Sequence, residues 1–154
     1  MEKVLIAVDD TKGSVAAAES LGKLFPSVRP ETVVLLYVEK MRGRSIIGDA
    51  LESEPDMQAM REALEGTEYQ EMLDQKANKI ISYYKKILED TGISGIKPVV
   101  KEGHPAEEIL STAKDEQAEM IIVGSRGGRR HDILLGSVSR EVADRSHLPV
   151  LIAR

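Results

Sequence analysis

The stretch from residue 124 to residue 139 contains the residue types that bind an anion. Gly124 and Gly127 come directly after an apolar segment, and Gly136-Ser137-Val138-Ser139 stands where a helical pattern begins. Glycines let backbone amides approach an anion without a Cβ in the way, and the free N–H groups of a helix N-terminus carry a positive partial charge. The two serine hydroxyls are further donors. This pattern predicts a phosphate-binding loop.

The same residues also have a purely structural explanation. Turns need glycine, and serine is a common helix cap. Asp9 follows the first apolar segment, where an acidic residue can cap the turn before a helix. Val38 and Val123 are apolar residues of expected strands and fit a buried core equally well. The residue types alone leave both explanations open.

Five apolar segments predict the strands that must position these residues. Runs of consecutive apolar residues are typical of strands buried on both faces. Pro98 lies inside the third segment and cannot donate to a ladder, so this strand is expected at an edge of the sheet. The expected strands are Val4–Val8, Thr32–Val38, Ile96–Lys101, Met120–Val123 and Val150–Ala153.

Segments with helical periodicity alternate with these strands. The apolar face of the first includes Leu24 and Phe25, before Pro26 ends the segment. The second starts with the capping-box pattern Thr67-x-x-Gln70 and closes near Gly92. The expected helices span residues 14–25, 69–88, 105–113 and 137–145.

This alternation predicts an α/β fold with right-handed βαβ crossovers. The expected architecture is an open, doubly wound, five-stranded parallel sheet with helices on both faces. Residues 41–66 interrupt the rhythm and are interpreted as an excursion after the second strand, with a short helix expected from Pro55 to Leu64. Ligands of such sheets bind beyond the carboxyl ends of the strands, where the strand order reverses. Gly124 is expected at that place.

Composition narrows the classes of function. The 154 residues fit one domain, residues 1–154. The 21 Lys and Arg against 26 Asp and Glu give a net charge of -5, which argues against a nucleic-acid binder. Without cysteine there are no disulfides, thiolate metal sites or cysteine nucleophile, and the three histidines are too widely separated in sequence to predict a metal site. No apolar run approaches the length of a membrane span, so we expect a cytoplasmic protein that does not enter the membrane.

The sequence resembles the universal stress protein family along nearly its whole length. The resemblance is carried by Val4 to Asp9, Gly103-His104-Pro105, Val123 to Gly127, Gly136 to Ser139 and Pro149 to Ile152. It implies a Rossmann-like fold of the adenine nucleotide alpha hydrolase-like type, with strand order 3-2-1-4-5. Nucleotide-binding members of the family carry Gly-x-x-Gly, nine further residues and then Gly-Ser or Gly-Thr.

The resemblance also implies which residues bind ATP, alone or with Mg²⁺. Asp9 would contact the adenosine and Val38 the adenine; Val123 and Gly124 would line the base and ribose; Arg126 and Gly127 would approach the phosphates, which Gly136, Ser137, Val138 and Ser139 would cradle. The pattern has one departure. Eight residues, rather than nine, separate Gly127 from Gly136.

The function implied is an adenine-nucleotide-binding regulatory or signalling module of the stress response, acting on an unidentified protein partner. No catalytic constellation accompanies the loop, so the alternatives are a weak ATP hydrolase and a dimeric interaction protein that has the fold without the nucleotide. In this family the C-terminal strand pairs across a two-fold axis. A homodimer through Val150–Ala153 would cover an apolar edge that is otherwise exposed.

Overall fold

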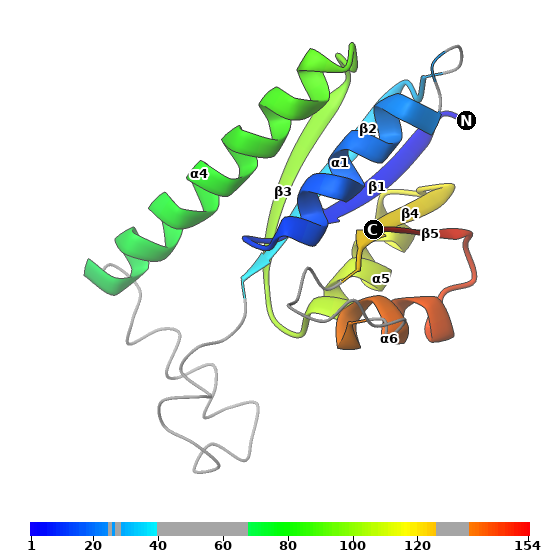
Figure 1. Ribbon diagram of the computed structural model, residues 1–154. Helices are drawn as coiled ribbons and strands as arrows, with labels where there is room; N and C mark the ends of the chain where they lie inside the picture. The colour runs from blue at the N-terminus through cyan, green and yellow to red at the C-terminus, as the bar shows by residue number, and fades with distance from the viewer. Residues whose placement is uncertain (25, 27–28, 40–67, 126–135) are drawn as a thin grey trace.

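The computed structural model describes residues 1–24, 26, 29–39, 68–125 and 136–154. Five strands form one sheet in the order β3-β2-β1-β4-β5, and every neighbouring pair is parallel (Figure 1). The predicted order is confirmed. The chain builds outward from β1 first on one side and then on the other, so the strand order reverses between β1 and β4. The strands are β1 (Lys3–Val8), β2 (Thr32–Glu39), β3 (Ile96–Glu102), β4 (Met120–Gly124) and β5 (Val150–Ala153).

Among the described residues, two helices cover each face of the sheet. α1 (Lys12–Leu24) and α4 (Glu68–Asp90) pack on one face, and α5 (Pro105–Asp115) and α6 (Ser137–Arg145) lie on the other (Figure 1). Successive strand residues point to opposite faces, so each strand supplies both layers of the core. In β1, Val4 and Ile6 pack with α1 and α4, while Leu5 packs with α5.

Local chemistry explains where α4 ends. Gly92 has a φ of 89°, a left-handed conformation that glycine adopts without the steric cost of a Cβ. The N–H of Gly92 donates to the carbonyl of Glu89 at 2.9 Å, and the N–H of Ile93 donates to that of Leu88 at 3.1 Å. These two bonds form a Schellman motif. The predicted end of this helix near Gly92 is confirmed.

Most expected elements are found within one or two residues, and one side chain is misplaced. β3, which contains Pro98, is an edge strand as predicted. Leu24 was expected on the buried face of α1 but is 52% exposed. Periodicity indicates the side of a helix that faces the sheet, not how far along the helix the contact extends, and Leu21 is the last buried residue of α1. Phe25, Thr67 and the excursion 41–66 with its expected short helix lie outside the described residues.

Within the described ranges, no helix is both long enough and apolar enough to cross a membrane.

An ion-pair network ties three elements at the amino edge of the sheet. Glu116, which follows α5, lies 2.7 Å from the Nζ of Lys97 on β3 and 3.7 Å from the Nζ of Lys3 on β1. The hydrogen bond from Lys97, together with the positive charges of Lys97 and Lys3, lowers the pKa of the Glu116 carboxyl. The network spans β2, which lies between β1 and β3.

The pKa of Glu116 is lower in the folded state than its ordinary value of 4.5. The carboxylate therefore stabilises the fold at pH values above 4.5, and this stabilisation is lost as the pH falls through the folded-state pKa. We expect Glu116→Gln to lower the free energy of unfolding modestly at neutral pH and to flatten the loss of stability on acidification. Urea denaturation across the acidic range measures both. Glu19→Gln, which removes an exposed i,i+4 pair with Lys23, is the control. Identical acid profiles for wild type and Glu116→Gln would contradict the prediction.

Candidate functional site

A cleft of about 200 Å³ lies at the carboxyl edge of the sheet. Eight of the ten residues expected at the site line this one cleft. They come from four separate segments of the chain: Asp9 after β1, Val38 in β2, Val123 and Gly124 in β4, and Gly136, Ser137, Val138 and Ser139 at the start of α6. The other two, Arg126 and Gly127, lie outside the described residues.

One wall of the cleft is apolar. Val38 and Val123 come from β2 and β4, and Ala7 from β1 lies between these strands in the sheet. Ile109 adds a buried side chain from α5. A wall of this kind excludes water and offers a surface on which a flat, uncharged group can pack.

The N-terminus of α6 forms another part of the cleft lining. Gly136 is the N-cap residue, with φ −62° and ψ 158°, and as a glycine it has no side chain to cap the helix. The first N–H groups of a helix have no partner within the helix, so this end attracts an anion. The two serines differ. Ser139 is buried and its hydroxyl donates to the carbonyl of Gly136 at 3.0 Å, whereas Ser137 is exposed. Of the two hydroxyls expected as phosphate donors, only that of Ser137 has no structural hydrogen bond among the described residues.

Asp9 builds the turn between β1 and α1. Its Oδ1 accepts hydrogen bonds from the backbone N–H of Thr11 at 2.8 Å, from the Thr11 hydroxyl, and from the Ser14 hydroxyl at 2.9 Å. The N–H of Asp9 in turn donates to the Ser14 Oγ at 2.8 Å. The structural explanation of Asp9 is therefore correct, and the side chain also lines the cleft. No described residue donates to its Oδ2, which leaves that oxygen as an acceptor.

α4 holds this turn in place from outside the cleft. The Tyr84 hydroxyl donates to the Thr11 carbonyl at 3.3 Å, and the Nζ of Lys76 lies 3.3 Å from the Oδ2 of Asp10. Burial, with a smaller contribution from the charge of Asp9, raises the pKa of Tyr84 to about 12. Tyr84 is therefore a permanent hydrogen-bond donor at neutral pH, and it connects α4 to the loop that carries Asp9.

Gly124 is required by the packing of α1 on β4. A Cβ at this position would lie 2.3 Å from the backbone carbon and oxygen of Gly13 and 2.9 Å from the nitrogen of Ser14. Real Cβ atoms do not approach a backbone so closely, so only glycine fits. The close contact keeps the first turn of α1, with Ser14, against the end of β4.

Glu39 follows Val38 but lies on the other face of the sheet, since neighbouring strand residues alternate. Burial raises the pKa of its carboxyl, and the charges of Glu102 and Asp74 raise it further. Its Oε1 is buried and has no hydrogen-bond partner among the described residues. The carboxyl of Glu39 is therefore easier to protonate than an exposed one, and Glu39 is not among the residues that line the cleft.

The model of the universal stress protein family matches residues 1–154. The chain belongs to the universal stress protein family. It is 32% identical over 159 aligned positions to universal stress protein MJ0577 of Methanocaldococcus jannaschii, an alignment that covers 99% of this chain and 94% of that protein. The solved structure of MJ0577 superposes with a TM-score of 0.74 at 30% identity, over 99% of this chain and 94% of that one.

Two other solved universal stress proteins carry a nucleotide. One, in complex with cAMP, has a TM-score of 0.65 at 18% identity and covers 99% of this chain and 96% of its own. The other, from Archaeoglobus fulgidus and in complex with dAMP, has a TM-score of 0.60 at 16% identity and covers 100% and 98% of the two chains. At these identities, the likeness between the two structures and this chain shows a shared fold and nothing more.

Several cleft residues were not predicted as site residues. Thr11, Ser14 and Ser125 add polar atoms to the lining, and Pro105 and Ile109 add the edge of α5. The position of Asp9 before Thr11 and Ser14 indicates that these two residues belong to the same turn. In an Asx-type turn, an Asp side chain accepts a hydrogen bond from the backbone N–H two positions later. Pro105 at the first helical position marks the helix that begins at the same edge of the sheet.

We expect Gly124→Ala to destabilise the protein by about 1–3 kcal/mol, because the added methyl group must displace the first turn of α1. Urea denaturation measures the change. Ser125→Ala, one residue later, removes atoms instead of adding them and is the matched control; it should change the free energy of unfolding by less than about 0.5 kcal/mol. Equal stability of Gly124→Ala and wild type would show that α1 does not pack on β4 as described.

Proposed function

We propose that this universal stress protein binds an adenine nucleotide, ATP above all, in the cleft between β1 and β4 and acts as a regulatory module of the stress response. The observation that carries the proposal is the meeting of eight expected residues, from four separate segments, around one cleft. Chain segments this distant in sequence meet there because the fold brings strand ends and helix starts together.

The two walls of the cleft suit the two ends of a nucleotide. Adenine packs against Val38 and Val123, and a ribose hydroxyl donates to the Oδ2 of Asp9. The phosphates lie at the N-terminus of α6, where the backbone N–H groups and the Ser137 hydroxyl donate. The cAMP and dAMP complexes of two other family members support an adenine nucleotide as the class of ligand.

We propose that Mg²⁺, where it accompanies the nucleotide, is bound by the phosphates and not by a site of the protein. Among the described residues, no group of three or more His, Asp or Glu side chains is arranged to hold a metal ion. Asp9 supplies one carboxylate to the cleft, and its Oδ1 is already used by the turn. The nucleotide itself then provides the oxygen ligands that Mg²⁺ prefers.

Calorimetric titration of ATP, ADP and AMP into protein stripped of carried-over ligand tests the proposal. We expect Ser137→Pro to weaken nucleotide binding about ten-fold, because proline at this first helical position removes one backbone N–H from the phosphate end. The substitution should leave α6 intact, since proline is favoured at the first position of a helix and Gly136 is already extended. Unchanged thermal stability would verify this.

Ser137→Ala is the matched control, because it removes the hydroxyl and keeps the N–H. A smaller loss of affinity than in Ser137→Pro is expected. Equal affinities of wild type and Ser137→Pro would place the phosphates elsewhere, and the absence of any binding at millimolar nucleotide would refute the proposed function. Phosphate release followed in the same samples tests the alternative of weak hydrolysis.

We also propose that two copies of the chain associate through β5. This strand is at the edge of the sheet, and Val150, Leu151 and Ile152 are only partly buried. The carbonyl of Pro149 accepts a hydrogen bond from the N–H of Ile121 in β4, and the carbonyl of Ala153 accepts one from the N–H of Ser125, just after β4. Because strand residues alternate, the backbone groups of Val150 and Ile152 point away from β4 and are placed to pair with another strand.

Ile152→Pro should therefore convert a dimer into a monomer, since it removes an outward N–H without removing a bond to β4. Light scattering at micromolar concentration measures the mass. Ile152→Ala loses the same side chain but keeps the N–H, and we expect it to remain more dimeric than the proline variant. A monomeric wild type would overturn the proposal.

A further inference from the structure

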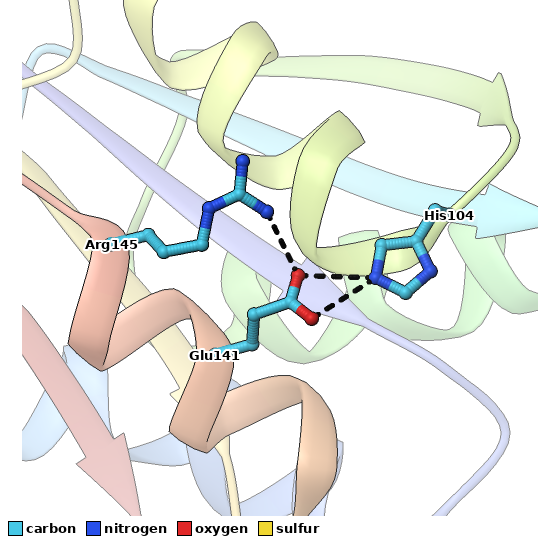
Figure 2. Close-up of polar contacts among 3 residues, drawn as sticks. All are labelled: His104, Glu141 and Arg145. Carbon is cyan, nitrogen blue, oxygen red and sulfur yellow. Dashed lines mark hydrogen bonds and ion pairs between the residues drawn. The ribbon is translucent and has the colours of Figure 1, made fainter.

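Three charged side chains join α5 to α6 beside the cleft (Figure 2). The Nε2 of His104, the N-cap residue of α5, lies 3.2 Å from Oε1 and 3.1 Å from Oε2 of Glu141 on α6. The Nη1 of Arg145 lies 3.1 Å from Oε2 of the same carboxylate. A carboxylate only accepts hydrogen bonds, so Nε2 of His104 carries a proton in this contact. Both the neutral and the protonated imidazole satisfy that requirement.

Glu141 lies on α6 one turn after Ser137, which lines the cleft. Glu141 follows Ser137 by four residues, which places both on one side of α6. On the side of α5, His104 directly precedes Pro105, which lines the cleft.

A negative charge at this position opposes an anionic ligand. Arg145 offsets the charge of Glu141 permanently, whereas His104 offsets it only when the imidazole is protonated. The charged residues that flank His104 in the sequence are Lys101 and Glu102 at the end of β3 and Glu107 and Glu108 in the first turn of α5. α6, which packs on α5, also carries Arg140 and Asp144. Among side-chain types, histidine is the one whose charge ordinarily changes between about pH 5 and 8.

We propose that His104, when its imidazole is protonated, neutralises the charge of Glu141, so that the cleft then binds anionic nucleotides more tightly. The inference rests on the proposed nucleotide binding and adds a regulation to it. Protonation adds one positive charge beside the phosphate end and pairs it with Glu141. A fall in pH therefore strengthens binding of the nucleotide, and the gain increases with the charge of the ligand.

The experiment compares dissociation constants of wild type and His104→Gln for ATP, AMP and adenosine at about pH 5.5 and about pH 8. The phosphates and the other histidines also titrate, but they do so in both proteins, so the difference between the two pH profiles isolates His104. His104 and Glu141 are partly exposed, with 53% and 36% of their side-chain surface accessible. A pair of this exposure predicts that wild type gains about two- to five-fold more affinity for ATP on acidification than the variant does.

Adenosine, which carries no phosphate, should show the same pH profile in both proteins. His147→Gln is the matched control, because His147 lies beyond the C-terminal end of α6, and it should retain the wild-type profile for ATP. The variant Glu141→Gln distinguishes an effect of the Glu141 charge on ATP binding from an effect of its contacts with His104 and Arg145. If Glu141 acts through its charge, this variant binds ATP more tightly than wild type at about pH 8, whereas loss of a purely structural link would weaken binding.

Identical pH profiles of wild type and His104→Gln for ATP would overturn the inference while leaving the proposed function in place. Weaker ATP binding by Glu141→Gln at the higher pH would also overturn it. Absence of ATP binding by wild type at both pH values would instead remove the proposed function, and the inference with it.

Discussion

In a parallel sheet all strands end at one edge, and every crossover helix begins at that same edge. This constraint determines the arrangement of the site. The ends of β1, β2 and β4 meet the first turns of α1, α5 and α6 around the cleft. The strand ends supply an apolar wall, and the helix starts supply N–H groups with positive partial charge. A cavity with one apolar and one anion-attracting side follows from the topology before any individual side chain is considered.

The residues that line the cleft are also the residues that hold it together. Asp9 and Ser14 exchange hydrogen bonds that form the turn after β1, and Gly124 allows the first turn of α1 to contact the end of β4. The hydroxyl of Ser139 is used within α6. What remains for a ligand is mainly backbone N–H groups, one oxygen of Asp9 and the apolar wall. A composition of this kind suits a site that binds and orients a ligand.

Electrostatics around the cleft depend on links between the helices. Tyr84 and Lys76 of α4 contact the turn after β1, so α4 and the cleft share a loop. On the other face of the sheet, Glu141 of α6 lies between His104, the N-cap residue of α5, and Arg145 of α6. Exposed ion pairs contribute little to global stability. Their charges also contribute to the electrostatic potential at the N-terminus of α6, an effect that salt screens.

The sequence by itself determined the order of the elements, the parallel sheet, the edge position of the strand with Pro98 and the end of α4 at Gly92. These properties depend on local periodicity, on glycine and proline chemistry and on the family pattern. All of these can be recognised in the amino-acid sequence without a structure. The sequence also predicted most of the cleft residues, but not which of them form structural hydrogen bonds and which remain available to a ligand. Only the tertiary structure decided that Asp9 builds its own turn, that Gly124 makes room for α1, that Ser139 bonds within its helix, that Leu24 is exposed, and that His104 meets Glu141. Each of these depends on distances between segments far apart in the chain or on one choice of hydrogen-bond partner among several, and no local pattern contains that information.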